Sequence, residues 1–260
     1  VIGTTGGRTI QSGVVINGNY SLTTTSGVTT LGGALTVGGN LSISGTTTAA
    51  VFDVTNSSHQ ISVGGNWSQS STGAINIFNQ RAGTVVFNGS GIQSITVGSG
   101  TAVPTFYNLQ VSNTTQPLSL SSVYTVGNNL TIDAGATCSV GTASFTVTGS
   151  VINNGTLNLG TNTLNVGANW ANTGTFNAGT GTVVFNSATT GRTITGNLTG
   201  TNKFNNLTFN NVAGGWSFAG NSADVGRNLI ITAASSLTLP STTLKVAGNI
   251  AYTARSEERR

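Results

Sequence analysis

The sequence predicts an all-β protein, specifically a parallel β-helix (β-solenoid) of about 20 residues per coil, which we expect to be right-handed. Three observations predict this fold class. A seven-residue motif returns six times, the segments between glycines are short and alternate apolar with small polar residues, and only 5% of the 260 residues are charged.

The composition separates this chain from most globular and disordered proteins. Globular domains usually contain about a quarter charged residues, but here Gly, Ser, Thr and Asn take their place. Disordered chains combine high net charge with few β-branched residues, whereas this one is 37% hydrophobic and rich in Val, Ile, Thr and Leu. We interpret it as a β-protein kept soluble by uncharged side chains.

The motif consists of an apolar residue, Val, a glycine-rich pair, Asn and a large apolar residue. Its copies are LTVGGNL (35–41), ISVGGNW (61–67), YTVGNNL (124–130), LNVGANW (164–170), ADVGRNL (223–229) and LKVAGNI (244–250). With the weaker copy FTVTGSV at 145–151, the valines are spaced by roughly 20 residues or a small multiple of that length, which is typical of solenoid coils.

A longer repeat is superimposed on the coil. GTVVFN occurs at 83–88 and 181–186, and FYNL at 106–109 corresponds to FNNL at 204–207, so both pairs are 98 residues apart. We interpret this offset as about five coils. The sequence predicts one solenoid domain over residues 1–252, with long repeats near 38–126, 127–225 and 226–252, the last incomplete, and a charged tail at 253–260.

Each coil should contain two or three short strands. Segments such as TLNLG, TNTLNVG and SITVG alternate in the way that half-buried strands do, and Gly or Asn follows them. No segment has the length and 3.6-residue periodicity of a helix. Because parallel strands stack at about 4.8 Å, some twelve coils would form a rod roughly 60 Å long.

In a stacked solenoid, equivalent residues of successive coils lie above one another, so the motif is expected at one corner. Its Gly would permit φ > 0, and its Asn tolerates the same region and can bond to the local backbone. We expect amide ladders of the kind known in cross-β stacks, formed by Asn40, Asn66, Asn129, Asn169, Asn228 and Asn249. The expected core stack comprises Leu41, Trp67, Leu130, Trp170, Leu229 and Ile250, with Phe87, Phe185, Phe106 and Phe204 as further interior positions.

Charge, hydrophobicity and cysteine content bear on the partners and the location of the chain. The net charge is +4, but the cations are scattered, so no phosphate-binding face and no nucleic acid is expected. No stretch approaches the roughly 20 apolar residues of a membrane span. The single cysteine, Cys138, is interpreted as a small buried residue. The chain contains no methionine and opens on VIGTTGG, which favours a processed, secreted protein.

Residues that could carry catalysis do not cluster. Asp53, Asp133 and Asp224 are about four coils apart, too far to share a substrate, and are expected to be isolated surface or turn residues. His59, the only histidine, lies near Asp53 and Ser57 or Ser58, but no GxSxG elbow accompanies it. Neither GxGxxG nor GxxxxGK[ST] occurs. We expect no catalytic, cofactor-binding or metal-binding residue.

The segments GTVVFNGSGIQSITV and YTVGNNLTI, with the second copy GTVVFNSATTGRTITG and FNNLTFNN, resemble the β-strand repeats of large secreted bacterial surface proteins. They are similar in style to filamentous-haemagglutinin-like adhesins and autotransporter passengers. The resemblance covers residues 12–252 and implies a β-solenoid on the cell surface. It implies roles in adhesion, biofilm or envelope layers, and it provides no catalytic residues to carry over.

Three functional hypotheses follow. The first is a non-catalytic extracellular structural protein that self-associates into a surface filament, fibre or matrix, with a possible subunit junction at Arg255, Glu257, Glu258, Arg259 and Arg260. The second is a stalk or binding fragment of a bacterial adhesin or phage fibre that contacts glycans through exposed aromatic rings. The candidates are Tyr20, Tyr107 and Trp216, although from the sequence each could equally belong to the core. The third and most remote is a β-helical polysaccharide lyase or hydrolase.

Overall fold

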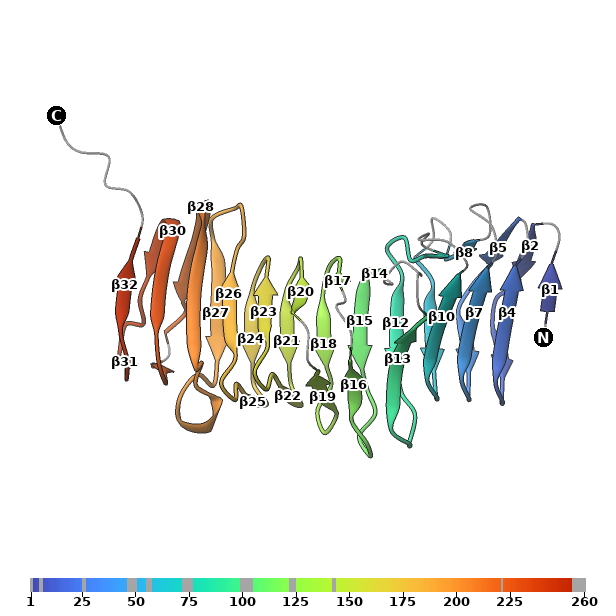
Figure 1. Cartoon of the computed structure of the whole chain (residues 1–260), viewed down its shortest axis with the longest axis horizontal. Helices are drawn as coiled ribbons and strands as arrows, with labels where there is room; N and C mark the ends of the chain where they lie inside the picture. Colours follow the sequence, from blue (N-terminus) through green and yellow to red (C-terminus); the bar gives the residue numbers. More distant parts are fainter. Residues whose placement is uncertain are drawn as a thin grey trace.

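A computed structural model of the chain shows an elongated rod of stacked coils, with the N-terminal coil at one end and the C-terminal coil at the other (Figure 1). The structure describes residues 2–4, 7–24, 27–45, 51–54, 58–71, 77–98, 105–121, 125–141, 144–220 and 222–253. All strand pairs in these residues are parallel. The predicted parallel β-solenoid is confirmed, and the coils average about 21 residues.

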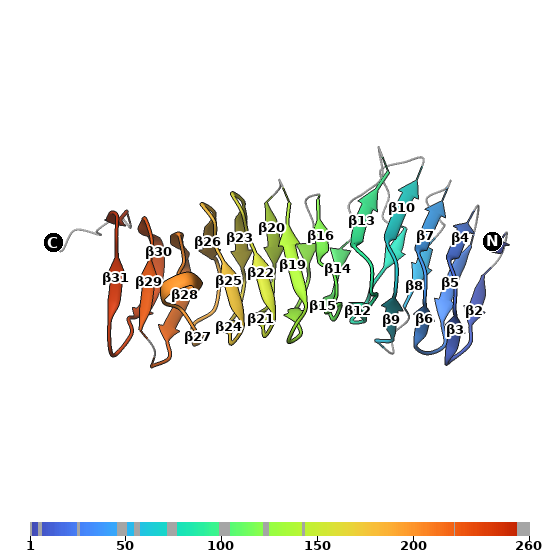
Figure 2. The same ribbon diagram turned by 90° about the horizontal axis from the view of Figure 1, so that it is seen from below.

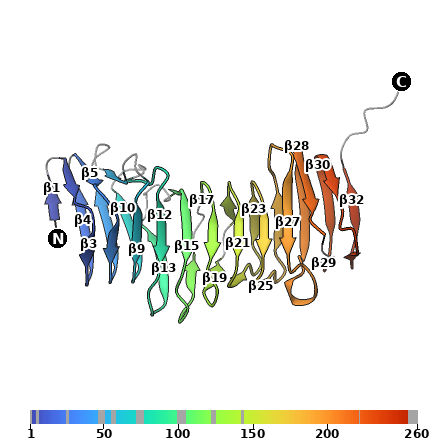
Figure 3. The ribbon, with the colours of Figure 1, turned by 180° about the vertical axis from the view of Figure 1, so that it is seen from behind.

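The rod has three faces, and the chain visits them in the fixed order first, second, third in every coil. Figure 3 shows several strands of the first face in the order of the coils. The first face carries β3 (Val14–Ile16), β6 (Leu35–Val37), β9 (Gln60–Val63), β12 (Thr84–Phe87), β15 (Asn108–Val111), β18 (Leu130–Ile132), β21 (Val151–Asn153), β24 (Trp170–Asn172) and β27 (Arg192–Gly196).

The second face can be followed from β4 to β31 in Figure 2. It carries β1 (Ile2–Thr4), β4 (Tyr20–Thr24), β7 (Leu41–Gly45), β10 (Trp67–Ser71), β13 (Gln93–Val97), β16 (Leu118–Leu120), β19 (Thr137–Val140), β22 (Thr156–Asn158), β25 (Thr175–Asn177), the 3-10 turn η1 (Gly200–Asn202), β29 (Ala223–Val225) and β31 (Leu244–Val246).

The third face begins with β2 and ends with β32. It carries β2 (Arg8–Ile10), β5 (Val28–Leu31), β8 (Val51–Asp53), β11 (Phe78–Asn79), β14 (Thr105–Phe106), β17 (Thr125–Val126), β20 (Phe145–Val147), β23 (Thr163–Val166), β26 (Thr182–Phe185) and β32 (Ile250–Tyr252). Two long strands, β28 (Asn206–Phe218) and β30 (Leu229–Thr238), turn the corner from the third face to the first.

Strand alternation places the core inside the rod. In β6, β18 and β24, for example, the burial alternates buried, intermediate, buried, as expected for strands with one face inward. Two aromatic clusters sit in this core, one in each of the two complete long repeats. The ring of Trp67 lies 4.8 Å from Phe78 and 5.4 Å from Phe106. The second cluster includes Trp170, Phe176 and Phe204, with centroid distances of 4.9 and 5.4 Å from the Trp ring, and it continues through Phe185 to Phe209.

The long repeat corresponds to four and two-thirds coils rather than five. GTVVFN forms β12 in its first copy and β26 in its second, fourteen strands later by subtraction. At three strands per coil, the second copy therefore falls one face behind the first: Phe87 lies on the first face and Phe185 on the third. Phe106 and Phe204 are likewise on the third and second faces. All four rings are buried.

This rotation also corrects the expectation of a single core stack. Leu41 pairs with Trp67 on the second face. Leu130 and Trp170 both pair with Val151 on the first face, and Leu229 pairs with Ile250 on the third. Five of the six side chains are buried, but Ile250 is 65% exposed because no further coil of the described residues covers it.

The motif contains glycine for a different reason from the positive φ that the sequence predicted. Positive φ occurs at nine other glycines and at none of the motif glycines. At most of them the constraint is close approach between coils: a Cβ on Gly64 would collide with the carbonyl oxygen of Gly38, and one on Gly167 with that of Thr148. Gly127 is an exception, because a Cβ there would make only ordinary contacts. None of the six motif asparagines has positive φ either.

Candidate functional site

The motif asparagines lie at the corners of the rod, where each strand ladder is interrupted. In five of the six, the side-chain Oδ1 atom accepts a hydrogen bond from the backbone N–H at the equivalent position of the next coil. For example, Asn40 donates its N–H to Asn19 Oδ1 at 2.8 Å, and Asn66 donates its N–H to Asn40 Oδ1 at 2.7 Å. The ladders therefore join mainly side chain to backbone, with one amide-to-amide bond from Asn228 Nδ2 to Asn206 Oδ1 at 3.4 Å, and they connect coils instead of closing a local turn.

The six asparagines divide among three ladders, one for each corner. The first runs from Asn19 to Ser94 between the first and second faces. The second runs between the third and first faces through Asn108, Asn129, Ser150, Asn169 and Thr193. The third joins Asn206, Asn228 and Asn249 between the second and third faces. Sequence reasoning missed Asn19, although INGNY at 16–20 was a detectable further copy of the motif.

Polar side chains inside the rod form a feature that sequence reasoning missed. Asn153 donates to Asn172 Oδ1 at 2.7 Å, and both are fully buried. Gln93, also buried, donates to the carbonyl oxygens of Val63 and Gly65. These residues satisfy backbone groups at irregular corners, a structural role for buried amides. No sequence signal distinguished them, because Asn and Gln are common throughout the chain.

The three aspartates remain on separate parts of the rod, each with its own partners. Asp53 is buried rather than exposed, and forms a two-point ion pair with Arg81 at 3.1 and 2.8 Å. The hydrogen bonds and charge of Asp53 raise the pKa of the Arg81 guanidinium above its ordinary value. Asp133 accepts from Gln110 and Ser112, and Asp224 accepts from the N–H of Gly200. Arg81 is thus a charged partner of the Asp53 carboxylate.

The remaining candidates for chemistry are placed as follows. Cys138 is completely buried, and burial raises the pKa of its thiol to about 12. Ser57 lies outside the described residues. Within the described residues, no group of three or more His, Cys, Asp or Glu side chains could hold a metal ion. No helix in that part of the chain is long and apolar enough to cross a membrane.

The aromatic residues considered for glycan contact mostly face the core. Tyr20 is 7% exposed and Trp216 only 2%, so neither ring forms an exposed platform on the side of the rod. Burial also raises the pKa of the Tyr20 hydroxyl above its ordinary value. Tyr107 is half-buried. Tyr20 and Trp216 therefore belong to the core, which is the alternative that the sequence left open for these rings.

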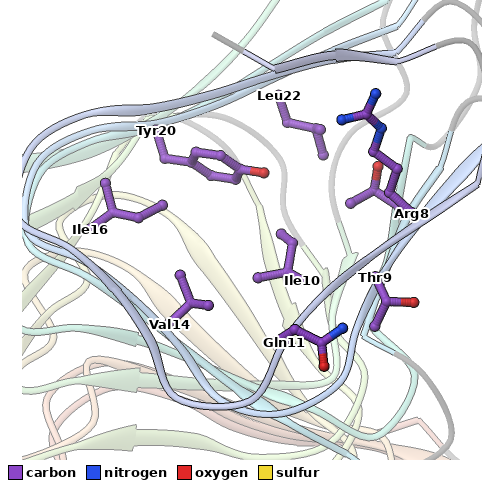
Figure 4. Close-up of a pocket in the computed structure, with 9 residues that line it drawn as sticks. Arg8, Thr9, Ile10, Gln11, Val14, Ile16, Tyr20 and Leu22 are labelled. Atoms are coloured by element: carbon purple, nitrogen blue, oxygen red, sulfur yellow. The ribbon is translucent and has the colours of Figure 1, made fainter.

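The N-terminal end of the rod is hollow. A cavity of about 300 Å³ opens there, lined chiefly by apolar side chains of β2, β3 and β4. Figure 4 shows Ile10, Val14, Ile16, Tyr20 and Leu22 turned toward one another around it. Among the described residues, no strand precedes β2 or β3 on its face, and β4 is preceded only by β1, whose Ile2 is in register with Leu22. The cavity therefore lies at the N-terminal end of the described core.

The C-terminal end exposes apolar side chains of the last described coil. Ile250 and Tyr252 are 65% and 68% exposed, although their register partners Leu229 and Ile231 belong to inward columns. Leu244 and Val246 of β31 are only partly buried against the core. The possible junction residues Arg255, Glu257, Glu258, Arg259 and Arg260 lie outside the described residues.

Comparison of the chain with protein-family models, curated proteins and solved structures gives no match in any of the three.

Proposed function

We propose that this chain is a non-catalytic extracellular structural protein: a β-solenoid protomer that self-associates head to tail into a surface filament, fibre or matrix. The observation that carries the proposal is the pair of complementary ends. One end has a cavity of about 300 Å³ lined by apolar side chains, and the other presents exposed apolar side chains on the same kind of three-stranded coil.

Backbone hydrogen bonding supports association through these ends. The edges of β1, β2 and β3 at one end, and of β31 and β32 at the other, have no further strand paired to them among the described residues. An unpaired edge is a template for adding another strand. Because every pairing inside the rod is parallel and all coils have the same chain direction, a second copy can add its first coil by the same pairing that joins internal coils.

Burial of apolar surface adds to this association. Covering a large apolar side chain contributes about 1.5–3 kcal/mol, and Ile250 and Tyr252 are each about two-thirds exposed. The sides of the rod are different in character, with Ser, Thr and Asn as the usual outward residues of strands such as β7 and β22. Apolar exposure at the ends and polar sides favour growth along the axis.

The extracellular assignment rests on the resemblance of the repeats to secreted bacterial surface proteins. It also agrees with a surface made mainly of uncharged polar side chains. Cell fractionation with an antibody to the native chain tests it: recovery in the surface or medium fraction is expected, and confinement to the cytoplasm would overturn it.

The assembly is tested by sedimentation velocity and electron microscopy over a range of protein concentration. We expect rods that lengthen with concentration and have an axial repeat of about 55 Å, because the described strands form nearly twelve coils at roughly 4.8 Å per coil. The variant Ile250→Asp with Tyr252→Asp should stay monomeric. Ile92→Asp is the matched control, because Ile92 is 68% exposed but lies on the side of the rod after β12. A wild-type chain that stays monomeric and folded throughout the range would overturn the proposal.

A further inference from the structure

At each end of the rod, the terminal strands of the three faces lie at different heights along the axis, so the end has the form of a step. Because the chain visits the faces in a fixed order, each strand lies one-third of a coil further along the axis than the one before it. Among the described residues, the N-terminal end carries β1 on the second face, β2 on the third and β3 on the first. The C-terminal end of the same described coils carries the last part of β30 on the first face, β31 on the second and β32 on the third.

Resting on the proposed function, we propose that successive copies dock with a rotation of one face about the rod axis. In this arrangement β1 of the incoming copy pairs with the last part of β30, β2 pairs with β31, and β3 pairs with β32. Every strand position at the junction is then filled, so the order of the three faces continues without interruption from one copy to the next. Three copies make one full turn.

The other two rotations leave strand positions empty. If identical faces were aligned, β1 would lie over β31 and β2 over β32, which leaves one empty position on the first face between β30 and β3. The remaining rotation places β1 over β32 and leaves two positions empty. Each empty position exposes two strand edges inside the junction, and unpaired buried backbone groups are costly.

The inward side chains are compatible with this rotation. With β3 on β32, Val14 lies over Ile250 and Ile16 over Tyr252, so two exposed apolar side chains enter the apolar cavity. At the same time β2 lies on β31, so Arg8, which is in register with the buried Thr29, lies over Leu244. With identical faces aligned, Arg8 would lie over Ile250 instead. The position of Arg8 therefore does not distinguish the two arrangements, and the choice of rotation rests on the closure of the strand positions.

Engineered disulfides distinguish the three rotations. Ala251 is the outward residue of β32, and the strand docked on it differs in each case. Val15 of β3 is its neighbour in the proposed rotation, Thr9 of β2 when identical faces align, and Gly3 of β1 in the third rotation. Neighbouring parallel strands are about 4.8 Å apart, within the Cα separation that a disulfide spans.

The three double variants are therefore Val15→Cys, Thr9→Cys or Gly3→Cys, each combined with Ala251→Cys. Cys138, the only native cysteine, is buried and should not react. After mild oxidation, we expect covalent multimers on a non-reducing gel from Val15→Cys with Ala251→Cys. The other two pairs should stay at the level of the single variant Ala251→Cys. Circular dichroism of each variant checks that the coil is intact.

The outcomes separate this inference from the proposed function. Rods in sedimentation with linkage mainly through Thr9→Cys or Gly3→Cys would overturn the rotation and leave head-to-tail assembly standing. Rods with no linkage in any pair would show that the contact is not strand addition at the ends, which overturns the inference. Absence of rods in all variants and in the wild type would overturn the proposed function itself.

Discussion

The Oδ1 atom of Asn40 accepts a hydrogen bond from the backbone N–H of Asn66, 2.7 Å away and one coil later. The donor lies at a corner, where the regular ladder between strands is interrupted. The side chain thus supplies the acceptor that a strand partner supplies elsewhere. Repeated at three corners, this bond explains why the chain returns to Asn after each glycine-rich pair.

Replacing Asn40 with Ala should lower the free energy of unfolding by about 1–2 kcal/mol, because it leaves the N–H of Asn66 without this acceptor. Asn40→Ser should recover part of the loss. A serine already serves this purpose in the second ladder, where Ser150 Oγ accepts from the N–H of Asn169 at 3.3 Å. Urea denaturation measures the effect, with the exposed Asn210→Ala as control. Equal stability of Asn40→Ala and the control would contradict the ladder's role.

Gly39→Ala should destabilise the solenoid, whereas Gly18→Ala should not. The two glycines occupy equivalent positions before Asn40 and Asn19. A Cβ at Gly39 would collide with the backbone N of Asn19 and with its Oδ1, while a Cβ at Gly18 has nothing within 4 Å. Since neither has positive φ, the difference isolates the contact between coils. Thermal unfolding of the two variants side by side measures it, and an equal shift in Tm would refute close approach as the reason for the motif glycine.

Trp170→Ala should cost about 3–5 kcal/mol, because it empties a fully buried site between Phe176 and Phe204. Trp170→Phe should cost much less than half of that. The substitution retains an aromatic ring and also removes the indole N–H, a buried donor without a partner. Denaturant unfolding of both variants provides the comparison. If Trp170→Phe were as damaging as Trp170→Ala, the unpartnered N–H could not be a significant cost.

Stability should fall between pH 9 and pH 12 through Cys138. Its pKa is raised from 9.0 to about 12 by burial, so the folded state keeps the thiol protonated after the unfolded state has begun to lose its proton. The contribution is complete below pH 9 and is lost as the pH rises toward 12, at up to about 1.4 kcal/mol per pH unit. Cys138→Ala should remove this part of the slope in urea titrations.

Thiol labelling gives an independent measurement of the same site. At pH 8, a thiol reagent should not label Cys138 in the folded chain, because the side chain is completely buried and protonated. Labelling should become complete in urea. Rapid labelling without denaturant would show that this part of the core opens readily, and would contradict the burial of Cys138.

Much of the fold could be predicted from the sequence, because its signals are local. Alternation in segments such as TLNLG predicts strands, and the recurrence of Asn before a large apolar residue predicts both a corner and an inward position. Trp67, Trp170 and Leu229 are indeed buried. The ion pair of Asp53 and Arg81 gave no such signal, since 28 residues separate them in the sequence and only the coiling of the chain brings them together.

The two ends of the rod could not be predicted as association sites, because local sequence does not show which coil lies at an end. Ile250 has the same local sequence as the other motif residues, and the pattern therefore predicts that it is buried. Its exposure follows only from its position in the last described coil. Tyr20 is a similar case. From the sequence alone it is a candidate for an exposed ring that contacts glycans, but in the structure it lines the cavity at the N-terminal end.

The sequence by itself determined the coil: short parallel strands, glycines at the corners, and an asparagine before the inward residue of each motif. Only the tertiary structure decided on which face each repeat lies. Partners in successive coils are as little as 19 residues apart, as for Val151 and Trp170, and as much as 28, as for Trp67 and Ile95. Because loops at the corners take up this variation in length, the 98-residue offset alone does not give the number of strands in the interval. The structure shows fourteen strands between the two copies of GTVVFN, and since three strands make a coil, the second copy is turned by one face relative to the first.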